Sequence, residues 1–445
     1  MSSEAPSAAI ESGGIHVLRA LRSRNYRFYF FGQGVSLIGT WMTYVATGWL
    51  VYRLTDSAML LGIVGFAGQI PALFLAPFAG VLVDRWNRYK VLVVTQVLAM
   101  AQSLTLAVLT LARFITIRQI IFLSIIQGVI NSFDIPARQA FVVDLVERPE
   151  DLPNAIALNS SVFNGARLIG PSIAGLVIAG VGEGMCFLID GLSFLAVLAA
   201  FWSMQLPPRT PRRSSRPLLR ELKEGLTYVY RFTPIRAILM LAALVSLVGI
   251  PYMVLMPVFA KEVLHGGPHT LGFLMAASGL GALAGGLYLA SRKTILGLGR
   301  LIAFSTALFG VSLCAFGLSH RLLLSLLFML TAGFGMLVQI AASNTIIQTI
   351  VDEDKRGRVM SFYAMAFMGV MPFGSLLAGS LAHQLGAPKT LVMGGVGCLI
   401  GAAIFARQLP SIRALVRPIY ASKGLLPGVA TGIQAAATLL VPPEE

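Results

Sequence analysis

The chain has 445 residues, of which 56% are hydrophobic and 12% are charged, against roughly 25% charged residues in ordinary soluble domains. So few charges cannot cover the surface of a soluble globule, and so many apolar residues exclude a disordered chain or a collagen-like fibre. A membrane protein with many spans remains, and we attribute the net charge of +15 to loops between spans rather than to a nucleic-acid surface.

Long apolar runs without strand-like alternation follow one another along the chain, and about 20 apolar residues cross a bilayer as a helix. The runs lie at 27–53, 57–83, 90–112, 117–138, 155–180, 185–205, 235–260, 270–290, 300–318, 322–345, 359–384 and 390–408. They predict an all-α membrane protein of twelve transmembrane helices. Residues 1–25 are expected to be a cytoplasmic segment and not a cleavable signal, because the first apolar run comes late and is long.

The first run carries polar side chains at helical spacing along one face. Such a face is not stable against lipid, so we expect it to line protein or a central cavity. Its candidate cavity residues are Gln33, Thr40, Trp41 and Tyr44.

The segment GVLVDRWNRYK (80–90) joins the second and third runs. Its glycine permits a close helix approach, and its acid can cap the following helix and hold basic side chains. Such a network is expected to act as a latch that forms when the cytoplasmic side of a carrier shuts. The latch candidates are Gly80, Asp84, Arg85, Arg88 and Lys90. The plain alternative is an ordinary basic loop.

The fourth run has polar residues at spacings of three and four, which places them on one face of a helix. They are Ser124, Gln127, Asn131, Asp134 and Arg138. Gln127 and Asn131 are candidate cavity residues, and Asp134 with Arg138 is a candidate proton-coupling pair. Removal of water disfavours a charged carboxylate and water access restores it, so one acid can couple protons to a conformational change. A fixed ion pair is the alternative.

The fifth run contains NGARLIGPSIAG (164–175) and the sixth contains Asp190. Small residues and a proline kink are expected to permit tight packing of the fifth helix against a neighbour. The packing candidates are Gly165, Gly170, Pro171 and Gly175. Arg167 and Asp190 are further proton-coupling candidates, because ionisable residues inside a membrane are by default functional or paired.

A basic segment rich in Pro and Ser, 207–234, is expected to be a cytoplasmic linker between bundles at 26–206 and 235–409, with a cytoplasmic tail at 410–445. Its second half forms either an amphipathic helix on an anionic leaflet or a plain linker. The second bundle adds the cavity candidates Tyr252, Gln339, Asn344 and Tyr363. Basic residues concentrate in one set of loops, which predicts that both termini lie in the cytoplasm.

An internal repeat indicates two pseudo-symmetric six-helix bundles. A shift of 204 residues superposes GARLIGPSIAG on GVMPFGSLLAG, and a shift of 206 superposes Gly80 on Gly286. Two loci that agree this closely indicate a duplicated unit, which is the layout of an alternating-access carrier. The second copy has Ala290 in place of the acid, so any latch should be asymmetric.

These motifs resemble those of the major facilitator superfamily, with 80–90 similar to its loop signature and 164–175 similar to its antiporter signature. The stretches 21–42 and 133–180 resemble the enterobactin-exporter-like branch. The resemblance implies the major facilitator fold and a monomeric, proton-driven exporter in the bacterial inner membrane. Known cargoes of that branch include catecholate siderophores, and related members handle macrolides and other amphipathic drugs.

Two other kinds of carrier stay open: one for lipid-like molecules, and a nutrient importer or uniporter. The mostly apolar interior favours a hydrophobic cargo over a sugar or a peptide. An enzyme, a metal site or a cofactor is not expected, because the three cysteines and five histidines are scattered and no GxxxxGK[ST] run occurs.

Overall fold

The computed structural model describes residues 18–205, 227, 229–230, 232–292 and 294–423, and its described elements are helices. Within this part, eleven helical segments are long and apolar enough to cross a bilayer. The first helix, α1 (Arg24–Thr55), is 32 residues long but less apolar, because it carries the polar face expected from its sequence. With α1 counted, the prediction of an all-α protein with twelve spans is confirmed.

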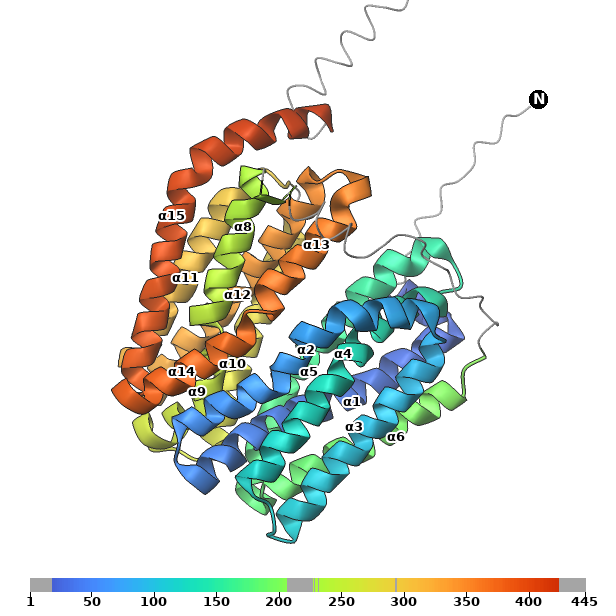
Figure 1. The fold of residues 1–445 in the computed structure, drawn as a ribbon, viewed down its shortest axis with the longest axis vertical. Helices are drawn as coiled ribbons and strands as arrows, with labels where there is room; N and C mark the ends of the chain where they lie inside the picture. Colours follow the sequence, from blue (N-terminus) through green and yellow to red (C-terminus); the bar gives the residue numbers. More distant parts are fainter. Residues whose placement is uncertain (1–17, 206–226, 228, 231, 293, 424–445) are drawn as a thin grey trace, which may run out of the picture.

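The first half of the chain folds into six helices joined by short turns (Figure 1). They are α1, α2 (Ala58–Arg85), α3 (Arg88–Leu111), α4 (Ile117–Leu145), α5 (Leu152–Val181) and α6 (Glu183–Trp202). Local signals set several of their ends. The Ser57 side chain accepts a backbone N–H at the start of α2, and Thr116 forms a capping box with Gln119 at the start of α4.

The second half contains spans that are interrupted by proline or glycine. Its elements are α8 (Thr233–Leu244), η3 (Val245–Gly249), α9 (Tyr252–Val258), η4 (Phe259–Val263), α10 (Pro268–Ser291), α11 (Leu298–Leu318), α12 (Leu322–Ile350), α13 (Glu353–Met368), α14 (Met371–Leu385) and α15 (Ala387–Ser422). Pro251 and Pro257 lack a backbone donor, which accounts for the irregular span from α8 to η4. The span formed by α13 and α14 breaks at Gly369, ahead of Pro372.

The last helix continues well past the end of the last apolar run, at 408, and reaches Ser422. Residues 1–17, most of the linker 207–234 and the tail from 424 lie outside the described residues. The bundle boundaries and the amphipathic helix of the linker therefore stay predictions.

The internal repeat reappears in the backbone. Gly182 turns the chain between α5 and α6 with φ +88°, and Gly386 does the same between α14 and α15 with φ +88°. These two glycines are separated by the same shift of 204 that relates the glycine patterns of the sequence. Both turns need a positive φ, which glycine adopts without strain.

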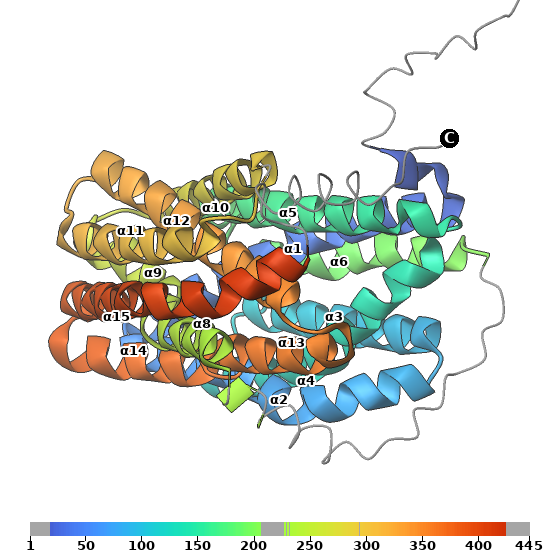
Figure 2. The ribbon, with the colours of Figure 1, turned by 90° about the horizontal axis from the view of Figure 1, so that it is seen from above.

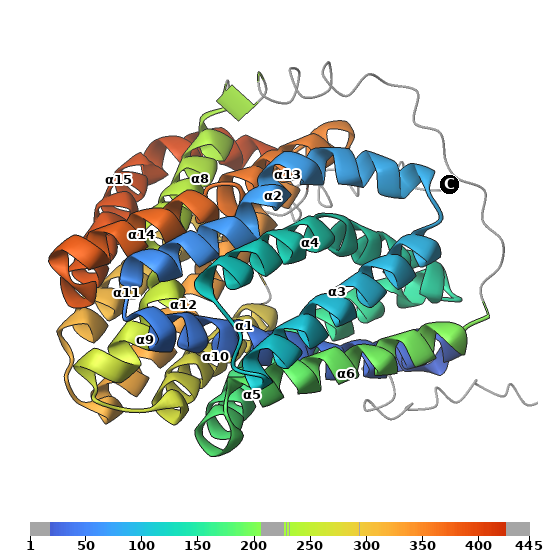
Figure 3. The same ribbon diagram turned by 60° about the horizontal axis from the view of Figure 1, so that its bottom comes forward.

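Each half is a bundle of its own (Figures 1 and 2). In the first half, α1 packs against α5 and α6, and α3 packs against α4 and α6. In the second half, α11 packs against α12 and α15. The most extensive contacts between the halves are made by two helix pairs: α2 lies along α14 (Figure 3), and α5 lies along α10.

The halves touch closely at one end of the molecule. A Cβ atom built on Gly62 of α2 would lie 2.9 Å from the Cα of Gly379 in α14. A Cβ on Gly175 of α5 would lie 3.1 Å from the Cα of Gly272 in α10. Helix backbones approach this closely only where side chains are absent or small, so these glycines shut this end.

The opposite end, which carries the 80–90 segment, is open. A Cβ built on Gly80 or on Gly165 would meet no described atom within 4 Å. The two bundles diverge at this end in Figure 1. Access to the interior is therefore from the end at which α1 begins.

Candidate functional site

A cavity of ≈ 270 Å³ lies between the two bundles. Its wall from the first half is rich in polar side chains from five helices: Thr40, Thr43, Tyr44, Thr47, Gln69, Gln102, Ser124, Gln127, Asn131 and Asp190. Its wall from the second half is apolar: Met253, Val254, Pro257, Leu271 and Met275. The wall from the first half also includes the apolar side chains Val45, Leu61, Val64, Leu106 and Phe194. A cavity whose polar groups all come from one half suits an amphipathic molecule, because each part of the molecule finds its own kind of contact.

Asp190 of α6 is an acidic residue in this lining, and it is 3% exposed. Its Oδ2 accepts hydrogen bonds from the Thr43 hydroxyl at 2.8 Å and the Ser103 hydroxyl at 2.9 Å. Its Oδ1 has no hydrogen-bond partner. Within the described residues, no basic side chain forms an ion pair with Asp190, so nothing there compensates a negative charge.

Close packing of α1 on α6 places Asp190 in this position. A Cβ built on Gly39 would lie 2.7 Å from Asp190 Oδ1 and 2.8 Å from Ser193 Oγ. The glycine lets α6 approach α1 until the carboxyl group reaches the hydroxyl of Thr43, one turn further along α1. Burial without a counter-charge favours the neutral form of a carboxyl group.

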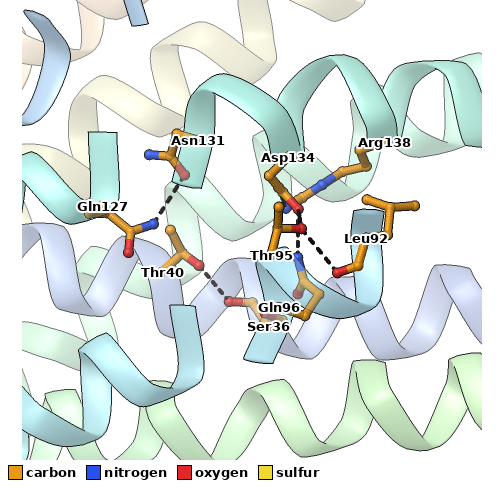
Figure 4. Close-up of polar contacts among 9 residues, drawn as sticks. All are labelled: Ser36, Thr40, Leu92, Thr95, Gln96, Gln127, Asn131, Asp134 and Arg138. Carbon is orange, nitrogen blue, oxygen red and sulfur yellow. Dashed lines mark hydrogen bonds and ion pairs between the residues drawn. The ribbon is translucent and has the colours of Figure 1, made fainter. Parts of the chain in front are cut away.

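Asp134 of α4 has very different surroundings, shown in Figure 4. Its Oδ1 accepts hydrogen bonds from Thr95 at 2.9 Å and Gln96 at 2.7 Å, and its Oδ2 pairs with Arg138. Asp134 is 4% exposed and does not line the cavity. Both carboxylate oxygens are satisfied, which corresponds to the fixed pair considered as the alternative for these residues.

The cavity candidates predicted from sequence fall into three groups. Thr40, Tyr44, Gln127 and Asn131 line the cavity, where Gln127 donates to Asn131 at 3.0 Å. Trp41 and Tyr252 lie beside it in a smaller pocket that also contains Arg167. The other candidates, Gln33, Gln339, Asn344 and Tyr363, are not in either lining.

These outlying candidates have contacts of their own. Gln339 donates to Ser343 at 3.4 Å, Asn344 accepts from Gln348, and Tyr363 donates to the carbonyl of Ile340. Gln33 is 2% exposed, and its Nε2 has no partner. Polarity in an apolar run does not distinguish a cavity wall from a contact between helices of one bundle.

Arg167 stacks over the ring of Trp41, with the guanidinium carbon 5.8 Å from the ring centroid. The helix that carries it is held close to α1, because a Cβ on Gly170 would lie 2.6 Å from the Cβ of Trp41. The carbonyl of Pro171 lies against Gly272 of the second half. Thus Gly170, Pro171 and Gly175 lie at close helix contacts, whereas Gly165 does not.

The 80–90 segment has part of the expected charge network. Arg88 at the start of α3 pairs with Asp144 at the end of α4, at 3.4 Å, and donates to the carbonyl of Ala140. Arg85 and Lys90 are exposed. The Asp84 side chain lies outside the described residues.

The cap of α3 differs from the expectation. Asn87 Oδ1 accepts the backbone N–H of Lys90 at 3.2 Å, so Asn87 and not Asp84 is the capping residue. The reason is that α2 continues to Arg85, which keeps Asp84 inside the preceding helix.

Sequence reasoning missed several polar residues around the cavity. Thr43 lies three residues after Thr40, so helical spacing alone placed it on the same face. Gln102 and Ser103 are adjacent polar residues in the apolar second half of α3, and Gln69 is isolated among apolar residues in α2. Such residues were a usable signal, but which of them meet depends on the packing of the helices.

Residues 16–419 match a protein family described as transmembrane secretion effector. The chain is 27% identical to the staphyloferrin A transporter of Staphylococcus aureus over 382 residues, which cover 85% of this chain and 94% of the relative. It is 24% identical to macrolide efflux protein A of Streptococcus pyogenes over 403 residues, which cover 88% and 98%.

The fold has solved counterparts. A bacterial homolog of the human lysosomal transporter Spinster, in an inward-facing and occupied conformation, superposes with a TM-score of 0.68 and 14% sequence identity. The match covers 86% of this chain and 96% of that chain. At this identity the likeness shows the fold alone.

Proposed function

Because this chain belongs to the transmembrane secretion effector family of the major facilitator superfamily, we propose that it exports an amphipathic small molecule from a bacterial cell in exchange for protons. The family expected from the motifs is thereby confirmed, and the relatives named above are transporters. The observation that carries the proposal is the cavity with one polar and one apolar wall and an uncompensated acid, Asp190, in its lining.

The orientation follows from the charges of the loops. The open end of the molecule carries the 80–90 segment and the start of α13, both rich in basic residues. Basic loops favour the cytoplasm, so the open end faces the cytoplasm of the bacterial inner membrane and both termini lie there. Cargo then enters from the cytoplasm or the inner leaflet.

Proton exchange is assigned to Asp190 in preference to Asp134. An acid that carries protons must lose its charge in one state and regain it in another. Arg138 holds Asp134 in an ion pair, and Thr95 and Gln96 occupy its other carboxylate oxygen, which fits a fixed structural contact. Asp190 has only hydroxyl partners and lines the cavity that cargo occupies.

Export requires the closed end to open and the open end to shut. In the present state the glycines of α2 and α5 near the closed end are in close contact, whereas Gly80 and Gly165 of the same helices are free. We assign Gly80 and Gly165 to the closing contacts of the alternate state. The 80–90 segment stays the proposed cytoplasmic latch of that state. The Arg88–Asp144 pair lies within the first bundle and already exists in the open state, so it holds the segment in place rather than closing the latch.

The cargo class rests on the cavity and on the relatives. The apolar wall accommodates a hydrophobic skeleton, and the polar wall offers hydroxyl and amide groups to oxygen-rich substituents. Both a siderophore and a macrolide have this character, and the names of two relatives refer to these two classes.

The proton assignment is tested in proteoliposomes that contain purified protein and an imposed pH gradient, with a macrolide and ethidium as probes. Asp190→Asn should abolish gradient-driven transport but keep downhill exchange, and Asp190→Glu should restore part of the drive. Asp134→Asn is the matched control and should keep the dependence on the gradient. Full gradient dependence in Asp190→Asn would move the proton role away from α6.

The direction and cargo are tested by untargeted metabolite profiling of cells and medium from a deletion strain, with and without iron. A compound retained in the cells supports export, and its appearance only under iron limitation identifies a siderophore. A nutrient left behind in the medium would instead establish import.

A further inference from the structure

A second cavity lies away from the transport path, on the second half of the chain. It has a volume of ≈ 210 Å³ and is formed by the turn before α11, the first turn of α11, the end of α12 and the last part of α15. We call it the α11–α15 groove. Its apolar floor includes Leu298, Ile346, Leu409, Ile412 and Val416, all of which are buried.

Three arginines surround this floor: Arg300, Arg413 and Arg417. All three are exposed, and none has an ion-pair or hydrogen-bond partner among the described residues. Three cations of like charge repel one another, so their convergence on one groove favours an anion between them. No acidic side chain contributes to the lining.

The end of α15 accounts for this arrangement. Leu409, Ile412 and Val416 lie at spacings of three and four, which puts them on the face that packs onto α11 and α12. Arg413 and Arg417 each follow a floor residue by one position, so they stand at the edge of that face. In Figure 1 this part of α15 bends over the end of its bundle, on the side where the protein is open.

The start of helix α11 adds positive charge to the groove. It begins at Leu298 after Gly297, and no side chain caps its first turn. The free N–H groups of a helix start carry a partial positive charge. This adds to the field of the arginines but is not the basis of the site, which rests on the three side chains and the apolar floor.

We propose that the α11–α15 groove binds an anionic phospholipid of the cytoplasmic leaflet, with the phosphate between the arginines and an acyl chain on the apolar floor. Basic pockets between membrane helices on the cytoplasmic side are suited to such headgroups. A lipid is favoured over free phosphate, because phosphate between the arginines would leave the apolar part of the ≈ 210 Å³ cavity unfilled. The assignment of the lipid to the cytoplasmic leaflet rests on the proposed orientation. The bound lipid would contact both the turn before α11 and the last part of α15.

The test uses full-length protein purified in detergent and native mass spectrometry to count bound phosphatidylglycerol against phosphatidylcholine. The wild type should retain phosphatidylglycerol selectively. Replacement of each arginine (Arg300→Gln, Arg413→Gln, Arg417→Gln) should weaken retention about fivefold, and the triple variant should weaken it roughly 100-fold. Arg407→Gln is the matched control: the residue is on the same helix and exposed but outside the groove, so retention should not change.

Three outcomes would overturn the proposal: equal retention of both lipids, equal loss in Arg407→Gln and the triple variant, or displacement of the lipid by millimolar inorganic phosphate. A variant that ends at Lys423 tests whether the chain's own tail occupies the groove, and a gain in retention would assign the groove to the tail. The readout is bound lipid in folded protein, checked by size-exclusion profile. It therefore stays valid whether or not the protein proves to be an exporter.

Discussion

Asp134 and Asp190 are both buried, at 4% and 3% exposure, yet their partners differ in kind. Asp134 is held by Arg138 together with Thr95 and Gln96, whereas Asp190 meets only hydroxyl groups. A buried charge with a full set of partners stabilises one geometry, and a buried acid without a counter-charge is free to change its protonation state. This contrast is the basis for our proposal that Asp190, and not Asp134, exchanges protons.

The residue-scale prediction concerns the Asp134–Arg138 pair. Asp134→Ala leaves Arg138 without its partner in a largely buried site, so it should lower the free energy of unfolding by about 3 kcal/mol. The double change Asp134→Leu with Arg138→Met should recover most of this, because no charge then stays buried. The midpoint of thermal unfolding in detergent measures both. Asp190→Asn serves as comparison and should shift the midpoint little; an equal loss there would contradict the contrast.

Helices α2 and α5 each carry one glycine in close contact with the second half and another, nearer the open end, without a described neighbour. On α2, Gly62 lies against Gly379 and Ser375 of α14, while Gly80 has open space around it. On α5, Gly175 contacts α10, while Gly165 does not. Each helix thus has one surface for the present state and an unused small-residue surface near the open end.

The element-scale prediction compares two substitutions on α2. Gly62→Leu should force apart α2 and α14, since a Cβ already comes within 2.7 Å of the carbonyl of Ser375. Gly62→Leu should therefore shift the population toward the alternate state, in which the presently closed end is open. Gly80→Leu meets no described atom in the present state but would obstruct closure of the open end, so it should favour the present state. Spin-label distances across both ends measure the shift, and a change of the same sign in both variants would refute the assignment.

At the scale of the whole molecule, an ion pair bridges the halves at the closed end. Lys261 in η4 pairs with Asp56 between α1 and α2, and it also lies 5.3 Å from the ring centroid of Tyr52. These contacts depend on the closed arrangement, because the partners belong to different bundles. They favour the present state over the alternate state in which this end is open, although none of the three residues lines the cavity.

Removal of this ion pair should have a small effect, because the side chains of Lys261 and Asp56 are 37% and 67% exposed. An exposed pair contributes about 0.2–1 kcal/mol, so Lys261→Gln should change the ratio of the two states by at most about fivefold. Asp56→Asn should act alike, since Asn tolerates the left-handed backbone at φ 45°. The double variant should change the ratio no further than either single variant. High salt screens the ion pair, so it should shift the wild-type ratio in the same direction as the substitutions. Additive single effects would show that the two side chains act separately.

The sequence by itself determined the fold class, because spans depend on local properties: the length of an apolar run, the positions of Gly and Pro, and the bias of basic loops. The repeat of 204 residues was visible in the glycines 165, 170 and 175 and in their counterparts, and it reappears as matching turns at Gly182 and Gly386. The polar stripes on the first and fourth helices also identified four residues of the cavity wall, Thr40, Tyr44, Gln127 and Asn131.

Only the tertiary structure distinguished the roles of similar residues. Asp134 and Asp190 were both candidates in sequence, where Arg138 was visible four residues after Asp134. The hydroxyl and amide groups that bond to the two acids come from other helices: α3 for Asp134, and α1 and α3 for Asp190. The open end and the apolar second wall of the cavity likewise arise from contacts between bundles. The physical reason is that burial and hydrogen bonding are set by distances between helices, which local sequence patterns do not encode.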